Sequence, residues 1–242
     1  MHLIKLSATP STNNFLKQLS VNHPVSDFTV VWADVQTNGK GQMGASWVTQ
    51  GANNLTFSVY VSEKYLLIEH LFTLNIMVAN AVLKALYFFN LTDIWVKWPN
   101  DILAVNKKIA GILIENTIKS SGSFSAIVGI GINLNQTDFE GFPQASSILN
   151  QFGIEINKEE LLQKIVAFLK EAILNAANIS EKEWRFYHEH LFRKDMVSTF
   201  ENKVGGLFNG IIKEVNRHGQ LVVQLENDDL MCYNLKEVKM LY

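Results

Sequence analysis

The chain has 242 residues, 48% of them hydrophobic, and a formal net charge of -2 at pH 7. This length allows one large domain, or a medium and a small one, and the near-neutral charge excludes the basic surface of a general nucleic-acid-binding protein. The single cysteine, Cys232, excludes an intramolecular disulfide framework and favours a reducing compartment. The N-terminal residues lack the apolar run of a signal peptide, and no apolar run reaches membrane-spanning length. We therefore expect a cytoplasmic protein with no membrane partner.

Strand-like and helix-like segments alternate along the chain. Strands are predicted from β-branched and aromatic runs with period-two alternation, and helices from apolar residues at helical spacing behind a capping residue. In chain order we predict a weak strand at 2–6, a helix from 11 or 12 to about 19, strands at 28–33 and 55–61, a long core helix at 66–89, strands at 94–98, 102–105, 108–116 and 125–135, and helices at 158–178 and about 180–192.

A glycine-rich segment, Asp34 to Trp47, lies between the second and third predicted strands and reads D-V-Q-T-N-G-K-G-Q-M-G-A-S-W. Its free N–H groups can form a nest for an anion, Lys40 adds a positive charge and Trp47 a flat apolar face. The segment matches G-x-G-x-x-G, but the following residues predict a strand and not a helix, which excludes a Rossmann dinucleotide site. It is either a nucleotide-binding loop or a surface turn beside a buried tryptophan.

A charged cluster follows the long helix, where Lys97, Asn100, Asp101 and Lys108 fall within twelve residues of one another. Two lysines and a carboxylate suit a triphosphate with Mg²⁺, because lysines oppose phosphate oxygens and a carboxylate holds the metal or its waters. The alternative is an ordinary solvated hairpin. The run W-P-N-D, in which Pro99 interrupts regular pairing, favours the functional interpretation.

The sequence pattern changes at about Val197, after which short strand-like segments separated by turns predict a small all-β barrel. We therefore predict two domains, 1–193 and 194–242. The histidines show no zinc-binding spacing, and no G-x-S-x-G elbow is present. The chain thus offers no obvious nucleophile, which fits a reaction whose substrates supply both the nucleophile and the leaving group.

These motifs, in this order, resemble the biotin–protein ligase (biotin–[acetyl-CoA-carboxylase] ligase) family. The resemblance is carried by G-K-G-Q-M-G-A-S-W, then K-W-P-N-D, K-K-I-A-G-I-L-I-E and G-I-G-I-N-L, and by the tail G-I-I-K-E-V-N-R-H-G-Q-L-V-V. It implies an α+β fold in which a mixed β-sheet packs against helices and is followed by a small SH3-like barrel. It also implies an ATP-dependent ligase that forms biotinyl-5′-AMP and then biotinylates one lysine of a biotin carboxyl carrier domain.

The resemblance also assigns roles to residues. Lys108 is expected to contact the activated carboxyl and the α-phosphate, with Lys40 as a second catalytic residue, and Asp101 to hold Mg²⁺ through phosphates or water. The expected biotin-binding residues are Ser11, Thr12, Asn13, Gln36, Gly39, Lys40, Gly41, Gln42, Lys108 and Gly111. The expected ATP-binding residues are Trp47, Lys97, Asn100, Asp101 and Asn133.

The chain departs from the family pattern at Lys40 and Gln42, where arginine is frequent. Lysine loses the planar fork and Gln42 loses the charge, so retention of the adenylate is in question. No DNA-binding segment precedes the S-T-N segment, and we expect no DNA partner. A free strand edge near residues 123–135 would allow a homodimer. A lipoate or octanoate ligase or transferase of the same fold, and a non-catalytic binding protein, remain alternatives; without the resemblance, Ser11, Thr12 and Asn13 need do no more than cap a helix.

Overall fold

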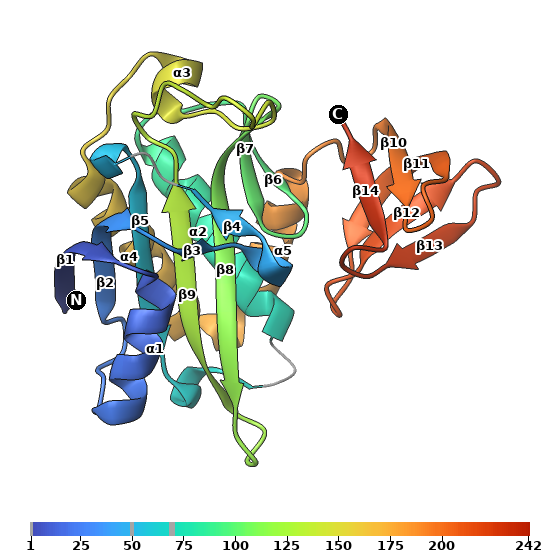
Figure 1. The fold of residues 1–242 in the computed structure, drawn as a ribbon. Coiled ribbons are helices and arrows are strands. Elements are labelled where there is room, and N and C mark those ends of the chain that lie inside the picture. Colours follow the sequence, from blue (N-terminus) through green and yellow to red (C-terminus); the bar gives the residue numbers. More distant parts are fainter. Residues whose placement is uncertain (1, 49–50, 68–70) are drawn as a thin grey trace.

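The computed structural model describes residues 2–48, 51–67 and 71–242. Residues 49–50, within the turn expected before the third strand, and residues 68–70, within the helix predicted at 66–89, lie outside the described residues. Two separate β-sheets organise the chain, one large and wrapped by helices, the other small and C-terminal (Figure 1). This arrangement confirms the expected α+β class.

The large sheet has seven strands in the order β1-β2-β5-β9-β8-β7-β6. β1 runs parallel to β2, and every other neighbouring pair is antiparallel. β9 pairs with β5 on one side and with β8 on the other, so residues 124–132 present no free strand edge to a second copy. The strands are β1 (Leu3–Thr9), β2 (Val30–Gln36), β5 (Leu55–Val61), β6 (Ile94–Lys97), β7 (Asp101–Ala104), β8 (Lys107–Ile118) and β9 (Phe124–Ile132).

The helices cover the two faces of this sheet unequally. α2 (Leu71–Phe88), α4 (Lys158–Leu174) and α5 (Ala176–Glu189) form the main core on one face, whereas α1 (Thr12–Asn22) lies on the other (Figure 1). By length and composition alone α2 is able to cross a membrane, yet about two-thirds of it is buried inside the protein, as predicted for a core helix. Ser11 is the N-cap of α1, as predicted, and its Oγ accepts from Asn14 N at 3.4 Å.

The glycine-rich segment forms a small hairpin over the face that carries α1. Its strands are β3 (Gly39–Lys40) and β4 (Ser46–Trp47), with Gly39 opposite Trp47. The turn is a short 3₁₀ segment, Gln42–Gly44, in which Met43 has φ 56°, a left-handed conformation uncommon outside glycine. We call residues 39–47 the glycine hairpin. A short helix that the sequence did not predict, α3 (Ile148–Phe152), lies farther along the chain.

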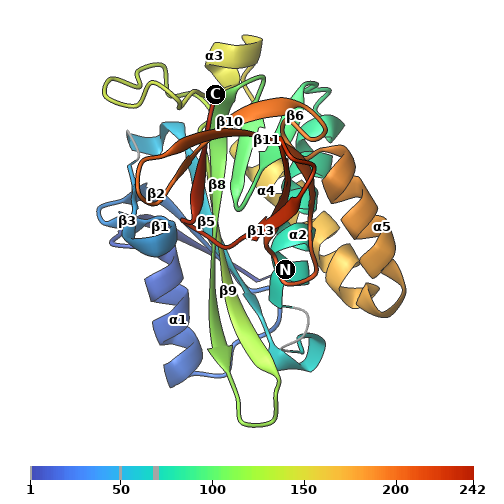
Figure 2. The ribbon, with the colours of Figure 1, turned by 90° about the vertical axis from the view of Figure 1, so that its right-hand side faces the viewer.

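The C-terminal sheet has five antiparallel strands in the order β13-β12-β11-β10-β14. β13 and β14 are its two edges, so the hydrogen-bonded sheet is consistent with an SH3-like barrel but is not closed. It lies beside the β6 edge of the large sheet in Figure 1 and in front of that sheet in Figure 2, and buried Trp98 Nε1 donates to Gly219 O at 2.9 Å. The strands are β10 (Val197–Asn202), β11 (Leu207–Val215), β12 (Leu221–Leu225), β13 (Leu230–Tyr233) and β14 (Val238–Leu241).

Candidate active site

One row of paired residues crosses the large sheet and sets out the site. Lys97 on β6 lies opposite Asp101 on β7, Asp101 lies opposite Gly111 on β8, and Gly111 lies opposite Gly131 on β9. Directly paired residues point to the same face of a sheet. The row therefore places the charged side chains of Lys97 and Asp101 beside two glycines, which have no side chain. The space above the glycines forms a shallow trough on the face under the glycine hairpin.

The indole of Trp47 fills this trough. A Cβ built on Gly131 would lie 2.5 Å from the ring, and one built on Gly111 would lie 3.1 Å from it. Any larger residue at Gly131 would displace the indole, which explains why glycine stands there. Trp47 Nε1 is buried and has no hydrogen-bond partner among the described residues. The group that lies close against these two glycines is thus a side chain of the protein itself.

The end of the trough nearest α1 is polar and buried. Ser58 Oγ donates to Thr12 Oγ1 at 2.7 Å or to Asn13 Oδ1 at 2.6 Å, and Asn13 Nδ2 donates to Glu115 at 2.9 Å. The Gln36 side chain closes the cluster, because its Oε1 accepts from Thr12 N at 2.8 Å. These groups offer both donors and acceptors in a place largely shielded from water, where hydrogen bonds discriminate strongly between ligands.

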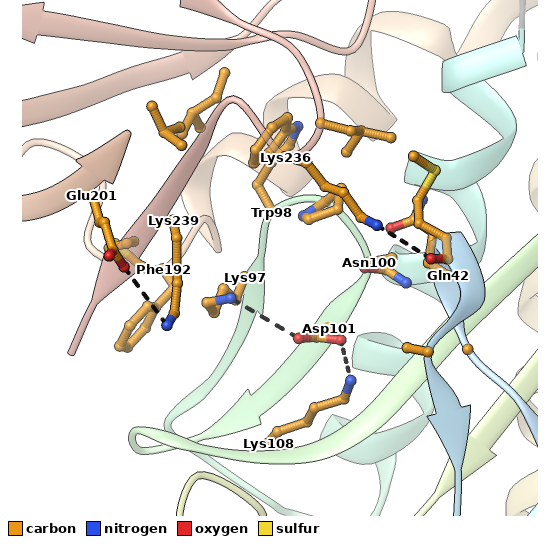
Figure 3. Close-up of a pocket in the computed structure, with 18 of the residues that line it drawn as sticks. Gln42, Lys97, Trp98, Asn100, Asp101, Lys108, Phe192, Glu201, Lys236 and Lys239 are labelled. Carbon is orange, nitrogen blue, oxygen red and sulfur yellow. Dashed lines mark hydrogen bonds and ion pairs between the residues drawn. The ribbon is translucent and has the colours of Figure 1, made fainter. Parts of the chain in front are cut away.

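The opposite end of the trough is charged. Lys108 Nζ lies 2.5 Å from Asp101 Oδ1, and Lys97 Nζ lies 4.0 Å from Asp101 Oδ2 (Figure 3). Burial is the main cause that lowers the pKa of Lys97; Lys108 and Lys239 lower it further, whereas Asp101 opposes this shift. A pairing irregularity between β7 and β8 follows Lys108, whose backbone N–H instead donates to Gln144 O at 2.7 Å. Such a bulge re-aims a side chain, here toward Asp101.

Three cavities meet at Lys108 and Trp47, which line all of them. A narrow cavity of about 50 Å³ lies beneath the hairpin and reaches the polar end. A cavity of about 540 Å³ contains the charged end and opens toward the C-terminal sheet. A third, of about 450 Å³, is lined by Asn133, Phe139 and Phe142. A ligand with three chemically different parts would thus have its junction at Lys108.

The remaining predicted residues lie around this junction, but several already have partners. Lys40 Nζ donates to Asn14 Oδ1 at 3.2 Å, Asn100 Nδ2 donates to Ile112 O at 2.6 Å, and Asn133 Nδ2 donates to Ser146 O at 3.0 Å. The Asn100 amide thus ties the turn to β8. Ser11, Gly41 and Gly111 line the narrow cavity, and Gln42 lines the large one. A Cβ on Gly39 would lie 2.4 Å from Trp47 O, so Gly39 serves the close pairing within the hairpin.

Several side chains of the site were not predicted from the sequence. Ser58 and Glu115 belong to the polar end, and their only signal was a polar residue at an inward position of an alternating strand. Lys236 and Lys239, from the C-terminal sheet, line the large cavity, and no local pattern indicated them. Within the described ranges no group of three or more His, Cys, Asp or Glu residues is placed to hold a metal ion.

Comparisons with known proteins agree with one another. The profile of the Biotin/lipoate A/B protein ligase family matches residues 6–133. A bifunctional ligase/repressor BirA from Bacillus spizizenii is 31% identical over 196 residues, which cover 79% of this chain and 56% of that protein, so the chain spans about half its length. A biotin–[acetyl-CoA-carboxylase] ligase from Mycobacterium tuberculosis is 24% identical over 223 residues, 91% of this chain and 82% of that one. The solved biotin protein ligase from Aquifex aeolicus in complex with biotin and ATP superposes with a TM-score of 0.82 at 25% identity, covering 99% of this chain and 98% of that one.

Proposed function

This chain belongs to the biotin/lipoate A/B protein ligase family, and we propose that it is a biotin–protein ligase. It would activate biotin with MgATP and attach it to one lysine of a biotin carboxyl carrier domain. The observation that carries the proposal is the meeting of three cavities at Lys108 and Trp47. Biotin, adenine and the leaving phosphates each require a separate cavity, and the bond-making atoms lie where the three meet.

In the first step a carboxylate oxygen of biotin attacks the α-phosphorus of ATP. A carboxyl–phosphate bond forms, the bond between the α-phosphorus and the bridging oxygen breaks, and pyrophosphate leaves. The Lys108 ammonium stands at the junction and stabilises the negative charge that gathers on the α-phosphate oxygens. Asp101 holds that ammonium in place at 2.5 Å.

In the second step the lysine amine of the carrier domain attacks the carbonyl carbon of biotinyl-5′-AMP. A carbon–nitrogen bond forms, AMP leaves with the bridging oxygen, and the amine loses a proton. The protein supplies no nucleophile to either step. Its contribution is position, charge and the exclusion of water by the glycine hairpin.

Magnesium enters as part of the MgATP substrate. A protein carboxylate together with phosphate oxygens is an ordinary set of ligands for Mg²⁺, and Asp101 is the carboxylate nearest the junction. Because Asp101 is paired with Lys108 in the free protein, binding of MgATP would redistribute these contacts. A metal ligand role for Asp101 is therefore part of the proposal and does not need a resident ion.

The polar end of the trough favours biotin over lipoate. The ureido ring of biotin carries two N–H donors and a carbonyl acceptor, whereas the dithiolane ring of lipoate carries neither. Thr12, Asn13 and Ser58 form a buried cluster of matching groups. An apolar ring could accept or donate no hydrogen bond there, so each group whose present partner it displaced would stay unpaired at a cost of about 1–3 kcal/mol.

The narrow cavity also indicates that the glycine hairpin must move. Small-molecule pockets are usually about 300–1,000 Å³, and about 50 Å³ remains beneath the hairpin because the Trp47 indole occupies the trough. Entry of biotin would lift the indole toward the third cavity, beside Asn133. There the ring can stack on adenine.

The proposal is tested by incubating the protein with MgATP, a carrier domain and either biotin or lipoate, and blotting with streptavidin or an antibody against lipoyl-lysine. We expect a label with biotin only. Pyrophosphate exchange that depends on lipoate and not on biotin would instead support the lipoate alternative. Absence of both exchange and label with a competent carrier would leave a non-catalytic binding protein.

A further inference from the structure

The Glu115 carboxylate on β8 fixes the orientation of the Asn13 amide at the polar end of the trough. Both hydrogens of Asn13 Nδ2 are directed at β8: one is donated to Glu115 Oε2 at 2.9 Å and the other to Leu113 O at 3.3 Å. An ionised carboxylate only accepts hydrogen bonds, so the reversed amide would bring its own oxygen against these two acceptors. Asn13 Oδ1 is therefore held toward Ser58, whose Oγ lies 2.6 Å from it.

The oxygen of this amide belongs to a buried group that has more acceptors than donors. The Thr12 hydroxyl donates its hydrogen to Gln36 Oε1 at 3.0 Å, which leaves Thr12 Oγ1 as an acceptor. Ser58 Oγ carries one hydrogen and lies 2.7 Å from Thr12 Oγ1 and 2.6 Å from Asn13 Oδ1. Because one hydrogen serves one of these oxygens at a time, a donor from a ligand would let both oxygens be paired.

The two oxygens lie where a ligand beneath the glycine hairpin would meet them. Thr12 and Asn13 line the narrow cavity, and a Cβ built on Gly129 would lie 2.3 Å from Asn13 Oδ1, so glycine there makes room for the amide. Glu115 approaches this cavity through Asn13, and its other oxygen, Oε1, lies 4.0 Å from Lys17 Nζ on α1. The carboxylate is thus placed to orient an acceptor without touching the ligand.

We propose that Glu115 is a positioning residue that sets the hydrogen-bond polarity of the polar end, so that this end selects a ring carrying N–H donors. The inference rests on the proposed function. One ureido N–H of biotin supplies the hydrogen that Thr12 Oγ1 and Asn13 Oδ1 otherwise share. A ring with oxygen in place of that N–H brings an acceptor against acceptors, and the pocket rejects it for that reason.

The test compares Glu115→Gln with Lys17→Gln, both in the full chain. Calorimetry measures the affinity for biotin and for the two cyclic carbamate analogues in which one or the other ureido N–H is replaced by oxygen. The unaltered protein should bind biotin at least about tenfold more tightly than the weaker analogue. A glutamine amide can donate to Asn13 Oδ1 and let the Asn13 amide turn, so Glu115→Gln should reduce this ratio about tenfold. Lys17→Gln removes the charge beside Glu115 but not its contact with Asn13, and should keep the ratio within twofold.

A kinetic measurement and a second variant separate this role from a general loss of packing. In biotin-dependent pyrophosphate exchange, Glu115→Gln should raise the KM for biotin about tenfold while kcat and the KM for ATP stay within twofold. Glu115→Asp keeps a group that only accepts, so its ratio should stay closer to that of the unaltered protein. A Glu115→Gln variant that weakens biotin and both analogues equally, or none of them, would overturn the inference. An unaltered protein that binds no biotin would instead overturn the proposed function.

Discussion

The two ends of the trough are lined by different chemical groups and therefore suit different parts of a ligand. The polar end is buried and lies where α1 meets the large sheet; its hydrogen bonds join neutral groups, except where the Glu115 carboxylate accepts from Asn13. The charged end faces a wide cavity, holds lysines in excess and takes its walls from both sheets. Mostly neutral groups that are already hydrogen-bonded select a ligand by shape and hydrogen bonding, whereas an excess of charge attracts any anion of suitable size.

The difference has a practical consequence for binding. At the polar end the ligand must replace internal hydrogen bonds one for one, so affinity depends on geometry and little on salt. At the charged end the interaction is screened by salt, because the cavity is open to solvent. We therefore expect the KM for ATP to rise with ionic strength while the KM for biotin stays nearly flat.

The largest expected effect comes from the residue common to both ends. Lys108→Ala should lower the rate of biotinyl-5′-AMP formation by roughly 10²–10³, the usual effect of losing a group that stabilises transition-state charge. Lys107→Ala is the matched control, because Lys107 is the neighbouring residue and donates to Pro143 O, outside the junction. Quenched-flow measurement of adenylate gives the rate, and circular dichroism verifies the fold. Equal rates for the two variants would contradict the role given to Lys108.

The next largest effect is expected from a substitution at the polar end, which should weaken biotin binding and leave ATP binding unchanged. Asn13→Ala removes an acceptor for Ser58 and a donor to Glu115, so buried groups lose their partners. Biotin affinity should fall about ten- to a hundredfold, while the KM for ATP stays constant. Ser20→Ala, at the exposed end of the same helix, should change neither. An equal loss of ATP and biotin affinity would mean that the two ends are not independent.

A gain of charge in the hairpin should tighten the charged end only. Gln42 lines the large cavity, and Gln42→Arg adds a planar guanidinium that binds phosphate with two hydrogen bonds. Release of biotinyl-5′-AMP into solution should slow about tenfold, measured by trapping free adenylate with hydroxylamine. The KM for biotin in the first step should hardly change, and a release rate like that of the unaltered protein would argue against contact between residue 42 and the adenylate.

The smallest effect is a pH dependence confined to the charged end. Because burial lowers the pKa of Lys97, its charge is lost as pH rises through this lowered value, before an ordinary lysine would lose its own. Across that window pyrophosphate affinity should fall about two- to fivefold, whereas biotin affinity should not change. Between the lowered pKa of Lys97 and the pKa of an ordinary lysine, the unfolded chain binds more protons than the folded one. The free energy of unfolding should therefore rise with pH across that range.

Lys97→Arg sharpens this test, because arginine stays charged and should remove the decrease in pyrophosphate affinity. The comparison uses calorimetry at several alkaline pH values, with thermal unfolding measured in parallel. A decrease of the same size in the arginine variant would show that another group titrates.

Segments that are continuous in sequence were predictable, and contacts between distant segments were not. The glycine hairpin, the Lys97–Lys108 cluster and the Ser11 cap each depend on local patterns. Ser58 was not predicted as a site residue, because a serine in an alternating strand also fits a solvated face. Lys236 and Lys239 lie more than a hundred residues from the other charged groups, and the packing of one sheet against another depends on Trp98 and Gly219, for which no spacing rule exists.

If biotin binds in the trough as proposed, the indole lying on Gly111 and Gly131 means that the free protein carries a side chain in the place of its own ligand. Such a protein binds with an affinity reduced by the fraction of molecules in which the trough is vacant. If that fraction is about one in ten, the apparent dissociation constant is about tenfold larger than the intrinsic one. Substitutions far from biotin that alter how firmly Trp47 rests on the sheet would therefore tune apparent biotin affinity without touching the bound ligand.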